Sequence, residues 1–386
     1  MEWWKKKKKK KKKKARAYDK KVRLIGAKLL EDLIECCDGK SNPIKFFSPD
    51  QILEATNNFS NSNHLFREWD SGYEWYSGKN DKHPMILIKR SSSLYNYRLE
   101  EDFCRDIAIS SMVSGQKNFL KLVGCCLESE YRAMVYHGVK KHYKLDLRGQ
   151  PWIRRIKIAE DIATALAYLH TAFPRPFVYR TMSLSNFLLD EDGVAKLWDF
   201  SFCVSIPQGE TFVQVNHVVG TVGYIDHNYM TRLLVSEKTD VFAFGVFMLN
   251  LLIGEERFHK EAIGLGDGYG YLEMDVPEIK LPNWVSKFKL VEETRMDVIA
   301  DPMMLQEMMG GISKQEICRM EAFLMLSNRC IGLRGEVPTM MEVARELRMI
   351  QTSLIIASSS SPSGETQFDS AQDISFSLLS NQTSNT

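Results

Sequence analysis

The side chains with the strongest chemical character lie in five short segments of this 386-residue chain. The first is an apolar run that ends in a lysine, Ile86-Leu87-Ile88-Lys89, and the second is a loop that leads into a hydrophobic hairpin, VYRTMSLSNFLLD at 178–190. The other three are LWDFS at 197–201, GTVGYID at 220–226 and KTDVFAFGV at 238–246. A lysine, an asparagine and an aspartate occur together by chance in any long chain, so the information lies in the order and spacing of the five segments.

In this order and spacing the segments resemble the protein-kinase signature set: the lysine of the third strand, the H-R-D loop with its asparagine, D-F-G, the activation segment and the D-V-x-x-F-G helix. The chemistry that this resemblance implies is phosphoryl transfer, which needs bound phosphates, bound magnesium and a carboxylate that orients the acceptor hydroxyl. The resemblance covers about residues 60–350. It implies an α+β, bilobal protein-kinase fold with a small strand-rich N-lobe and a larger helical C-lobe.

Several residues of the phosphoryl-transfer set are retained. Lys89 matches the phosphate-binding lysine, and Asn186 and Asp199 match the two magnesium ligands. Asp240 matches the aspartate that braces the catalytic loop. Weak residual binding of Mg-ATP is therefore one expectation, although no cofactor is required. The alternative is that Asn186 and Asp199 serve only the geometry and hydrogen bonding of their loops.

The acid–base element of catalysis is absent from the sequence. Tyr179-Arg180-Thr181 occupies the H-R-D place. Thr181 therefore replaces the aspartate that accepts the substrate proton in an active kinase. A threonine hydroxyl cannot act as a base near neutral pH, and loss of a positioned general base costs around 10²–10⁴ in rate. Ser183 stands where a kinase usually carries a lysine that steadies the transferring phosphate. The sequence therefore predicts no catalytic residue and no enzymatic activity.

The phosphate loop also departs from the kinase pattern. Alignment of WYSG at 75–78 with the V-Y-K-G of the family places Glu68, Asp70 and Tyr73 where three glycines belong. Glycine is needed there because backbone N–H groups must approach the phosphates closely. Two carboxylates that face a triphosphate would repel it, so this loop is predicted to be degenerate.

The adenine side of the expected nucleotide site is bulkier than usual. Leu87 replaces the alanine that normally contacts adenine, and Tyr136 fits the gatekeeper position ahead of a hinge at His137-Gly138-Val139. The helix that should supply a glutamate to Lys89 offers Asp106 instead, one methylene shorter.

Local sequence indicates a narrower group of kinases. The segments EATNNFS at 54–60, LVGCCLESEYRAMVY at 122–136 and ALAYLH at 165–170 resemble the plant receptor-like kinases, particularly the wall-associated and cytoplasmic branches. The degenerate motifs most resemble the ZRK-type pseudokinases of plant immunity. That resemblance implies an adaptor bound to a coiled-coil NLR immune receptor, which senses modified receptor-like cytoplasmic kinases or bacterial effectors.

Two function classes therefore compete. The first is a pseudokinase adaptor in plant innate immune signalling. The second is a weakly active Ser/Thr protein kinase that binds ATP through Lys89, Asn186 and Asp199 and uses some other base. Thr181 and the acidic phosphate loop favour the adaptor.

The activation segment is a candidate for modification. Its hydroxyl-bearing residues are predicted to be weakly anchored for two reasons. Ser201 replaces the glycine of D-F-G, and the ion pair that usually ends the segment is missing, with Asn228 in place of the glutamate and Val337 in place of the arginine. A loose segment of this kind would be accessible to a modifying kinase or bacterial acyltransferase, although these hydroxyls are equally consistent with ordinary loop residues. The candidate acceptors are Ser201, Ser205, Thr211 and Thr221.

The elements that must position these residues divide the chain into four parts. Residues 1–21 are predicted to form a disordered polybasic head, and residues 22–59 a helical extension with Ser48 as an N-cap. The kinase-like domain spans 60–350, with the N-lobe at 60–139 and the C-lobe at 140–350. A Ser-rich tail at 357–386 is predicted to be disordered.

Charge is distributed unevenly along the chain. Residues 1–23 carry fourteen basic and two acidic side chains, so the net charge of +2 divides into +12 for these residues and −10 for the remainder. The head could attach to an anionic membrane surface, with Trp3 and Trp4 inserted at the interface; the alternative is an idle solvated tail. No apolar run is long enough to span a bilayer. We therefore expect a cytoplasmic protein, associated with the inner face of the plasma membrane if the head binds, and no nucleic-acid partner.

Overall fold

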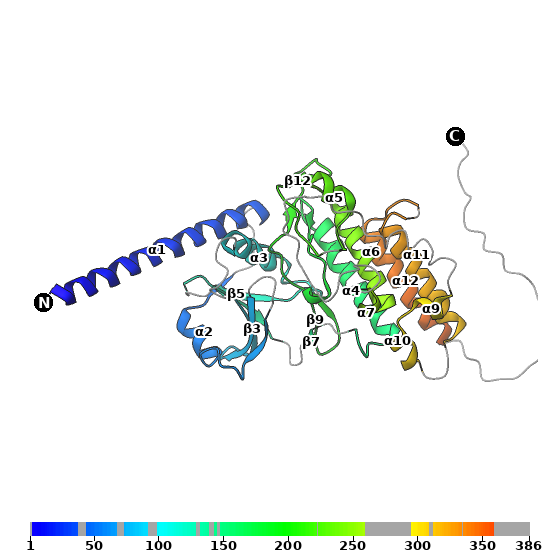
Figure 1. The fold of residues 1–386 in the computed structure, drawn as a ribbon, viewed down its shortest axis with the longest axis horizontal. Coiled ribbons are helices and arrows are strands. Elements are labelled where there is room, and N and C mark those ends of the chain that lie inside the picture. The colour runs from blue at the N-terminus through cyan, green and yellow to red at the C-terminus, as the bar shows by residue number, and fades with distance from the viewer. Residues whose placement is uncertain are drawn as a thin grey trace, which may run out of the picture.

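The computed structural model describes residues 2–37, 44–67, 73–91, 99–128, 132–138, 143–144, 147–221, 223–258, 295–308, 312–333 and 335–358. The strands of the N-terminal part form one lobe, and the helices of the C-terminal part pack beside one another in a second lobe (Figure 1). The α+β, bilobal fold predicted from the sequence is confirmed.

A six-stranded sheet forms the centre of the small lobe, in the order β1-β5-β6-β4-β3-β2. Neighbouring strands of this sheet run antiparallel, except β1 and β5, which run parallel. The side chains of the central strand β4 alternate between two covered faces, so Ile86 and Ile88 lie in one apolar cluster and Leu87 in another. The strands are β1 (Lys45–Phe46), β2 (His64–Arg67), β3 (Tyr73–Asn80), β4 (His83–Ser91), β5 (Leu122–Cys126) and β6 (Ala133–His137).

The segment before residue 60 is part of the small lobe. β1 extends the sheet at β5, and Gly124 permits this approach because a Cβ there would lie 2.0 Å from the carbonyl oxygen of Lys45. Helix α2 (Pro49–Ala55) follows, with Ser48 and Gln51 in a reciprocal capping box. The predicted extension at 22–59 therefore contains a strand as well as helices, and the sheet of the small lobe begins before the predicted boundary at residue 60.

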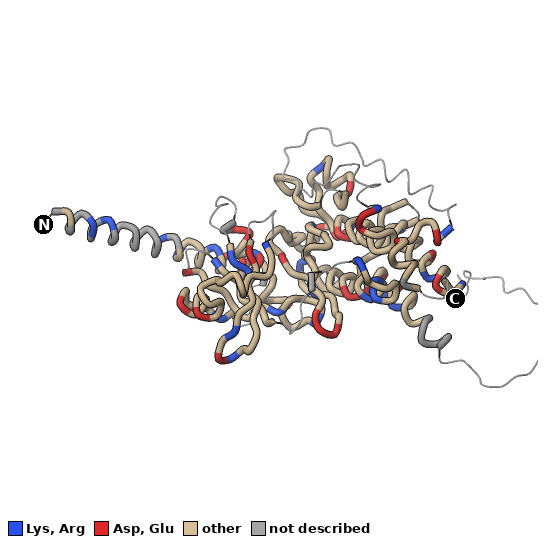
Figure 2. Tube along the Cα trace, turned by 60° about the horizontal axis from the view of Figure 1, so that its bottom comes forward, with Lys and Arg blue, Asp and Glu red and all other residues tan. Residues whose placement is uncertain are grey.

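Helix α1 (Glu2–Cys37) is continuous through the lysine run, where the sequence predicted a disordered head. Its C-terminal half packs on α3 (Leu99–Val113), with Ile25 and Leu29 buried, and the remainder extends away from the lobe (Figure 1). The prediction considered the repulsion between lysines but not their high helix propensity. It also left out that adding one residue to an existing helix is far more favourable than nucleating a new one. Figure 2 shows basic positions along this helix.

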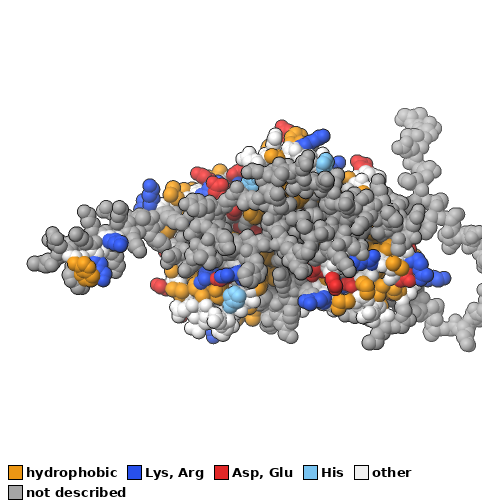
Figure 3. Space-filling model, viewed as in Figure 1, with side chains coloured by type: hydrophobic (Ala, Val, Ile, Leu, Met, Phe, Trp, Pro, Cys, Tyr) orange, Lys and Arg blue, Asp and Glu red, His pale blue; other side chains and the backbone are white. Residues whose placement is uncertain are grey.

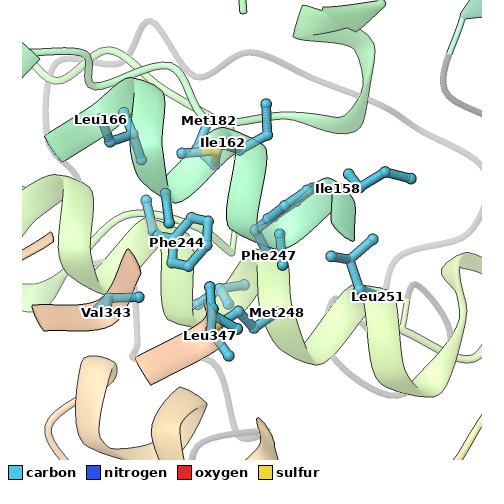
Figure 4. Packing of buried hydrophobic residues seen from close by; sticks show 14 of the residues in the cluster. Ile158, Ile162, Leu166, Met182, Phe244, Phe247, Met248, Leu251, Val343 and Leu347 are labelled. Carbon is cyan, nitrogen blue, oxygen red and sulfur yellow. The ribbon is translucent and has the colours of Figure 1, made fainter. Parts of the chain in front are cut away.

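The core of the large lobe lies between α4 (Trp152–Thr171), α6 (Glu237–Ile253) and α12 (Met340–Ser358). The apolar side chains of α4 and α12 recur at helical spacing, whereas α6 is apolar and buried on nearly all sides, as expected of a helix in the centre of a lobe. Figure 4 shows Ile158, Ile162 and Leu166 of α4 facing Phe244, Phe247, Met248 and Leu251 of α6, with Val343 and Leu347 of α12 beside them. The other helices of this lobe are α5 (His227–Arg232), α7 (Glu255–Phe258), α9 (Met296–Ile299), α10 (Pro302–Glu307) and α11 (Lys314–Cys330).

Short strands of the large lobe carry the loops of the kinase-like site. The first sheet has the order β10-β9-β7, and two further pairs are β11 with β8 and β12 with β13. Their bounds are β7 (Tyr143–Lys144), β8 (Phe177–Val178), β9 (Phe187–Leu189), β10 (Ala195–Leu197), β11 (Val204–Ser205), β12 (Val213–Gln214) and β13 (Leu234–Val235), with a 3₁₀ turn at Leu184–Asn186.

The predicted Ser-rich tail lies almost wholly outside the described residues, since α12 ends at Ser358 and residues 359–386 follow it. No helix within the described ranges has the length and apolar character needed to cross a membrane.

Candidate functional site

Lys89 lies at the end of β4 in a buried cluster of charges. Its Nζ is 3.1 Å from Oδ2 of Asp106 on α3 and 3.3 Å from Oδ1 of Asp199. The side chain of Lys89 is completely buried. Burial raises the pKa of the Asp106 carboxyl, and the positive charge of Lys89 opposes that rise. The structure thus brings Lys89 to its predicted partner Asp106, and a second carboxylate completes the cluster.

Aromatic rings seal this ammonium group from solvent. The ring of Tyr73 lies 4.2 Å from Nζ of Lys89, and the ring of Trp198 lies 5.0 Å from it. A desolvated cation over aromatic faces gains about 2 kcal/mol or more. Tyr73 was predicted at a former glycine position of the phosphate loop. In the structure its side chain occupies space beside the lysine that would hold a phosphate. The other predicted loop positions, Glu68 and Asp70, lie outside the described residues.

A stack of aromatic rings continues from there across the predicted adenine site. The ring of Trp75 lies 4.9 Å from that of Trp198 in an edge-on arrangement, and 5.5 Å from that of Tyr136 in a stacked one. Trp75, Tyr136 and Leu87 have no exposed surface, and they share one apolar cluster with Leu188 of the large lobe. Both lobes therefore meet through side chains where a nucleotide would lie in an active kinase.

The predicted hinge follows Tyr136 on β6. His137 is exposed, and Gly138 donates a hydrogen bond of 3.1 Å to the carbonyl oxygen of Met85. A Cβ at Gly138 would come within 2.7 Å of the backbone of Met85, which explains the glycine. Val139 lies outside the described residues.

The catalytic loop holds no group that could accept a proton from a substrate. Thr181 is buried, and its hydroxyl has no hydrogen-bond partner in the described part of the chain. Ser183 caps the following 3₁₀ turn, where its hydroxyl accepts a hydrogen bond of 3.3 Å from the N–H of Ser185. The hydroxyl groups that replace the base and the lysine are thus either unused or structural.

Asn186 and Asp240 both bond to the backbone of this loop. The Nδ2 of Asn186 donates to the carbonyl oxygen of Thr181 at 2.7 Å. The carboxylate of Asp240 accepts from the N–H groups of Tyr179 and Arg180 at 2.7 and 2.9 Å. These contacts agree with the structural alternative raised for Asn186 and with the bracing role expected of Asp240.

Ser201 strengthens the start of the activation segment. Its hydroxyl donates a hydrogen bond of 2.6 Å to Oδ1 of Asp199, and its side chain is buried. Asp199 has a left-handed φ of 66°, whereas Ser201 is not among the described residues with positive φ. The permissive dihedrals of glycine are therefore not needed at Ser201, and the prediction that this serine loosens the segment is wrong.

The rest of the segment is anchored through Arg180. Its Nη1 donates to the carbonyl oxygen of Phe202 at 3.0 Å, and its Nη2 donates to that of His217 at 3.3 Å. Tyr229, which is fully buried, accepts further hydrogen bonds from the same guanidinium. One arginine thus ties the beginning, middle and end of the segment together, so the predicted weak anchoring does not hold for the described residues.

The four candidate modification sites differ in accessibility. Ser201 is buried, Ser205 and Thr221 are half-buried, and Thr211 is exposed beside the exposed ring of Phe212. An enzyme that modifies the native fold would reach the Thr211 hydroxyl most easily.

The residues present do not fit Mg-ATP. Lys89 already faces two carboxylates, Asp199 already accepts from Lys89 and Ser201, and the amide of Asn186 already donates to backbone. Among the described ranges, no group of three or more His, Cys, Asp or Glu side chains could hold a metal ion.

Sequence reasoning missed two parts of this site. The first part is the pair of tryptophans: Trp75 begins the WYSG segment, and Trp198 directly precedes Asp199. Together with Leu87 and Tyr136, such large side chains indicate that the nucleotide space beside Lys89 is filled. The bond between Arg180 and Tyr229 could not be found this way, because it joins residues 49 positions apart.

Comparison with known proteins gives the wider context. The protein kinase domain family matches residues 76–289, which begin after the phosphate-loop positions. The inactive serine/threonine-protein kinase ZRK12 of Arabidopsis thaliana is 59% identical over 363 residues, 94% of this chain and 87% of that protein. The non-functional pseudokinase ZRK15 of the same plant is 51% identical over 381 residues, 95% of this chain and 99% of that protein.

A third relative carries a different description. The serine/threonine-protein kinase ZRK4 of Arabidopsis thaliana is 43% identical over 347 residues, 84% of this chain and 91% of that protein. The two relatives with higher identity are described as inactive or non-functional, in agreement with Thr181 in the catalytic loop and the filled nucleotide site. The chain therefore belongs to the protein kinase family and, within it, to the ZRK-type pseudokinases of plants.

Proposed function

We propose that this pseudokinase is an adaptor in plant innate immune signalling. It binds a coiled-coil NLR immune receptor and presents to it modified client kinases, of the receptor-like cytoplasmic type, or pathogen effectors. The observation that carries the proposal is the closed site: Tyr73, Trp75 and Trp198 fill the space around Lys89 that a phosphate donor would need.

A filled nucleotide site is consistent with a protein that acts by binding partners rather than by catalysis. The apolar cluster of Trp75, Tyr136, Leu188 and Trp198 joins the two lobes, so their relative position does not depend on a bound nucleotide. Because packed cores resist continuous deformation, such a protein offers the same docking surfaces at any nucleotide concentration. A receptor and a client could then bind to a preformed adaptor.

The second candidate, a weakly active kinase, is favoured by the description of relatives such as ZRK4. It would require Lys89 to leave two carboxylates and Tyr73 to move off the ammonium group, each of which exposes a buried charge or breaks packing. It would also require a base other than Thr181. These requirements favour the adaptor function over the kinase function.

The basic part of α1 supports a cytoplasmic position at the inner face of the plasma membrane as part of this proposal. Trp3 is 63% exposed at the free end of the helix, and Nζ of Lys7 lies 4.8 Å from its ring. Figure 3 shows hydrophobic and basic side chains next to each other at this end. An exposed indole beside lysines is the combination that inserts at an anionic membrane interface.

Three measurements on the full chain test the adaptor function. Thermal melting with and without Mg-ATP should give the same midpoint, and radiolabelled ATP should transfer no phosphate to the chain or to a generic substrate. Purification of the tagged chain from plant tissue should recover a coiled-coil NLR receptor, in amounts that ATP depletion does not change. Phosphate transfer that Asp199→Asn abolishes would establish the kinase instead.

A further inference from the structure

A small hollow lies where the end of β6 meets the segment before β5 and strand β10 of the large lobe. Its volume is about 220 Å³, and it is lined by Phe119, Leu120, Lys121, His137 and Lys196. Two of these residues are apolar and three carry basic groups. Of the predicted site residues that the structure describes, the hinge residue His137 is the one that lines this hollow.

The walls of the hollow are fixed by backbone hydrogen bonds from both lobes. The N–H of His137 donates to the carbonyl oxygen of Lys121 at 2.8 Å, as neighbours in the β5–β6 pair. The N–H of Leu120 donates to the carbonyl oxygen of Leu197 at 3.0 Å, which joins the segment to β10. The hollow is therefore preformed.

The basic groups differ in how far they are already neutralised. Lys196 lies 3.1 Å from Oδ2 of Asp190 and also donates to the carbonyl oxygen of Lys117, so its charge is partly compensated. Lys121 is exposed and forms no ion pair with the described residues. His137 is exposed too, and only its Nδ1 has a partner, the neighbouring carbonyl oxygen of Gly138 at 3.0 Å. Lys121 and Nε2 of His137 are thus available to a ligand.

A second histidine and further lysines lie close to His137, and the lysines supply the positive charge. The ring of His83 lies 5.9 Å from that of His137. Burial lowers the pKa of His83, and the charges of His137, Lys45, Lys121 and Lys82 lower it further. Since residues 24–386 carry a net charge of −10, this cluster is a local region of positive potential on an acidic body.

We propose that this hollow binds a phosphate monoester carried on a small apolar group. Phe119 and Leu120 contact the apolar group, while the ammonium group of Lys121 and the imidazolium form of His137, through its Nε2–H, donate charge-assisted hydrogen bonds to the phosphate dianion. A volume below the ~300–1,000 Å³ of pockets for drug-sized ligands suits one aryl or short alkyl group. The ester could be a small molecule or a phosphorylated side chain of a protein, since both present the same chemistry.

Titration calorimetry on the full chain with phenyl phosphate tests this site. Phenyl phosphate should bind more tightly than inorganic phosphate or phenol alone, and its affinity should fall as salt is added. Lys121→Gln and His137→Gln should each weaken binding about tenfold, which is the effect of losing one hydrogen bond to a charged group. Lys238→Gln, an exposed lysine on α6, is the matched control and should leave the affinity unchanged.

A phosphotyrosine peptide in the same titration distinguishes the two sources. Tighter binding of the peptide than of phenyl phosphate assigns the site to a protein partner, and weaker binding assigns it to a small molecule. Two results would overturn the proposal: no heat of binding with phenyl phosphate, or the same affinity in Lys121→Gln as in Lys238→Gln. Because all three substituted side chains are exposed, unchanged melting midpoints would show that each variant folds.

Discussion

The hydroxyl group of Tyr229 accepts hydrogen bonds from Nε and Nη2 of Arg180, at 3.0 and 2.5 Å. The same hydroxyl also accepts from the N–H of Val219 at 2.7 Å and donates to the carbonyl oxygen of Val219 at 3.0 Å. In many kinases a phosphate on the activation segment supplies the partner for an arginine. Here an internal tyrosine does so, and the segment is held without modification.

Replacement of Tyr229 by phenylalanine should therefore destabilise the large lobe. The change leaves buried donors of Arg180 and Val219 without their acceptor, which costs about 1–3 kcal/mol in the free energy of unfolding. Urea unfolding measures this loss, and limited proteolysis should cut the activation segment sooner. Tyr168→Phe is a control, because the contacts of Tyr168 are with the rings of Phe119 and Phe173. Equal stability of the two variants would contradict the role assigned to Tyr229.

Removal of the aromatic filling should open the nucleotide site. The double change Tyr73→Gly and Trp75→Val restores the residue types of an active kinase, and loss of the large ring costs about 2–4 kcal/mol of stability. If these rings are what excludes the nucleotide, Mg-ATP should raise the melting temperature of this variant and not that of the wild type.

A second tryptophan provides the comparison for that experiment. Trp152 is buried in the core of the large lobe, so Trp152→Val creates a cavity away from the site. It should lower stability by a similar amount and give no response to Mg-ATP. A double variant that folds but ignores Mg-ATP would show that the charge cluster around Lys89, rather than the rings, prevents binding.

The small lobe should lose the stabilisation that the ionised Glu74 carboxylate provides when the pH becomes acidic. Burial acts to raise the pKa of this carboxyl, but hydrogen bonds from Arg67 and Tyr76 and the charge of Arg90 outweigh it and hold the pKa below 4.5. The stabilisation by Glu74 is therefore complete above pH 4.5 and is lost as the pH falls through the lowered pKa of the folded state.

Glu74→Gln isolates this effect. The variant should be about 1–3 kcal/mol less stable than the wild type at pH 7, because a buried ionic network loses its shared partner. The difference should shrink as the pH falls below 4.5. Glu128→Gln, at an exposed position, should change stability by less than about 0.5 kcal/mol at either pH. A difference for Glu74→Gln that does not depend on pH would contradict the assignment.

Membrane attachment through α1 should depend on charge. Substitution of the ten lysines at 5–14 by glutamine keeps the helix propensity but removes about 1 kcal/mol of attraction per lysine near an anionic surface. The wild type should float with anionic vesicles at low salt, and the variant should not. Equal flotation with neutral and anionic vesicles would exclude the electrostatic mechanism.

Among the hydroxyls of the activation segment, Thr211 should be the modified one. Mass spectrometry of the chain from challenged plant tissue should find modification at Thr211 ahead of the buried Ser201, because the native fold exposes only the former. Thr211→Val should lower the triggered immune output while receptor association persists. Thr352→Val, an exposed threonine on α12, is the control and should signal normally. Normal output from Thr211→Val would exclude this residue as the sensor.

The sequence predicted elements whose determinants are local. The cap at Ser48, the strand that ends in Lys89 and the fold class all follow from short patterns, and Asp106 was correctly placed beside Lys89. Contacts between distant segments were harder to predict. The sequence indicated a loose activation segment because Ser201 replaced a glycine, whereas the actual anchor is a bond between Arg180 and Tyr229 that no local pattern encodes.

The pairing of the N-terminal segment with later parts of the chain has a consequence for its synthesis. β1 pairs with β5, and α1 packs on α3, so these two elements are synthesised before the partners that cover them. Until α3 emerges, the apolar side chains Ile25 and Leu29 stay uncovered, and transiently exposed apolar surface promotes aggregation. The lysines that precede them carry one sign of charge and repel neighbouring nascent chains. This repulsion between like charges opposes association of chains whose small lobe is incomplete.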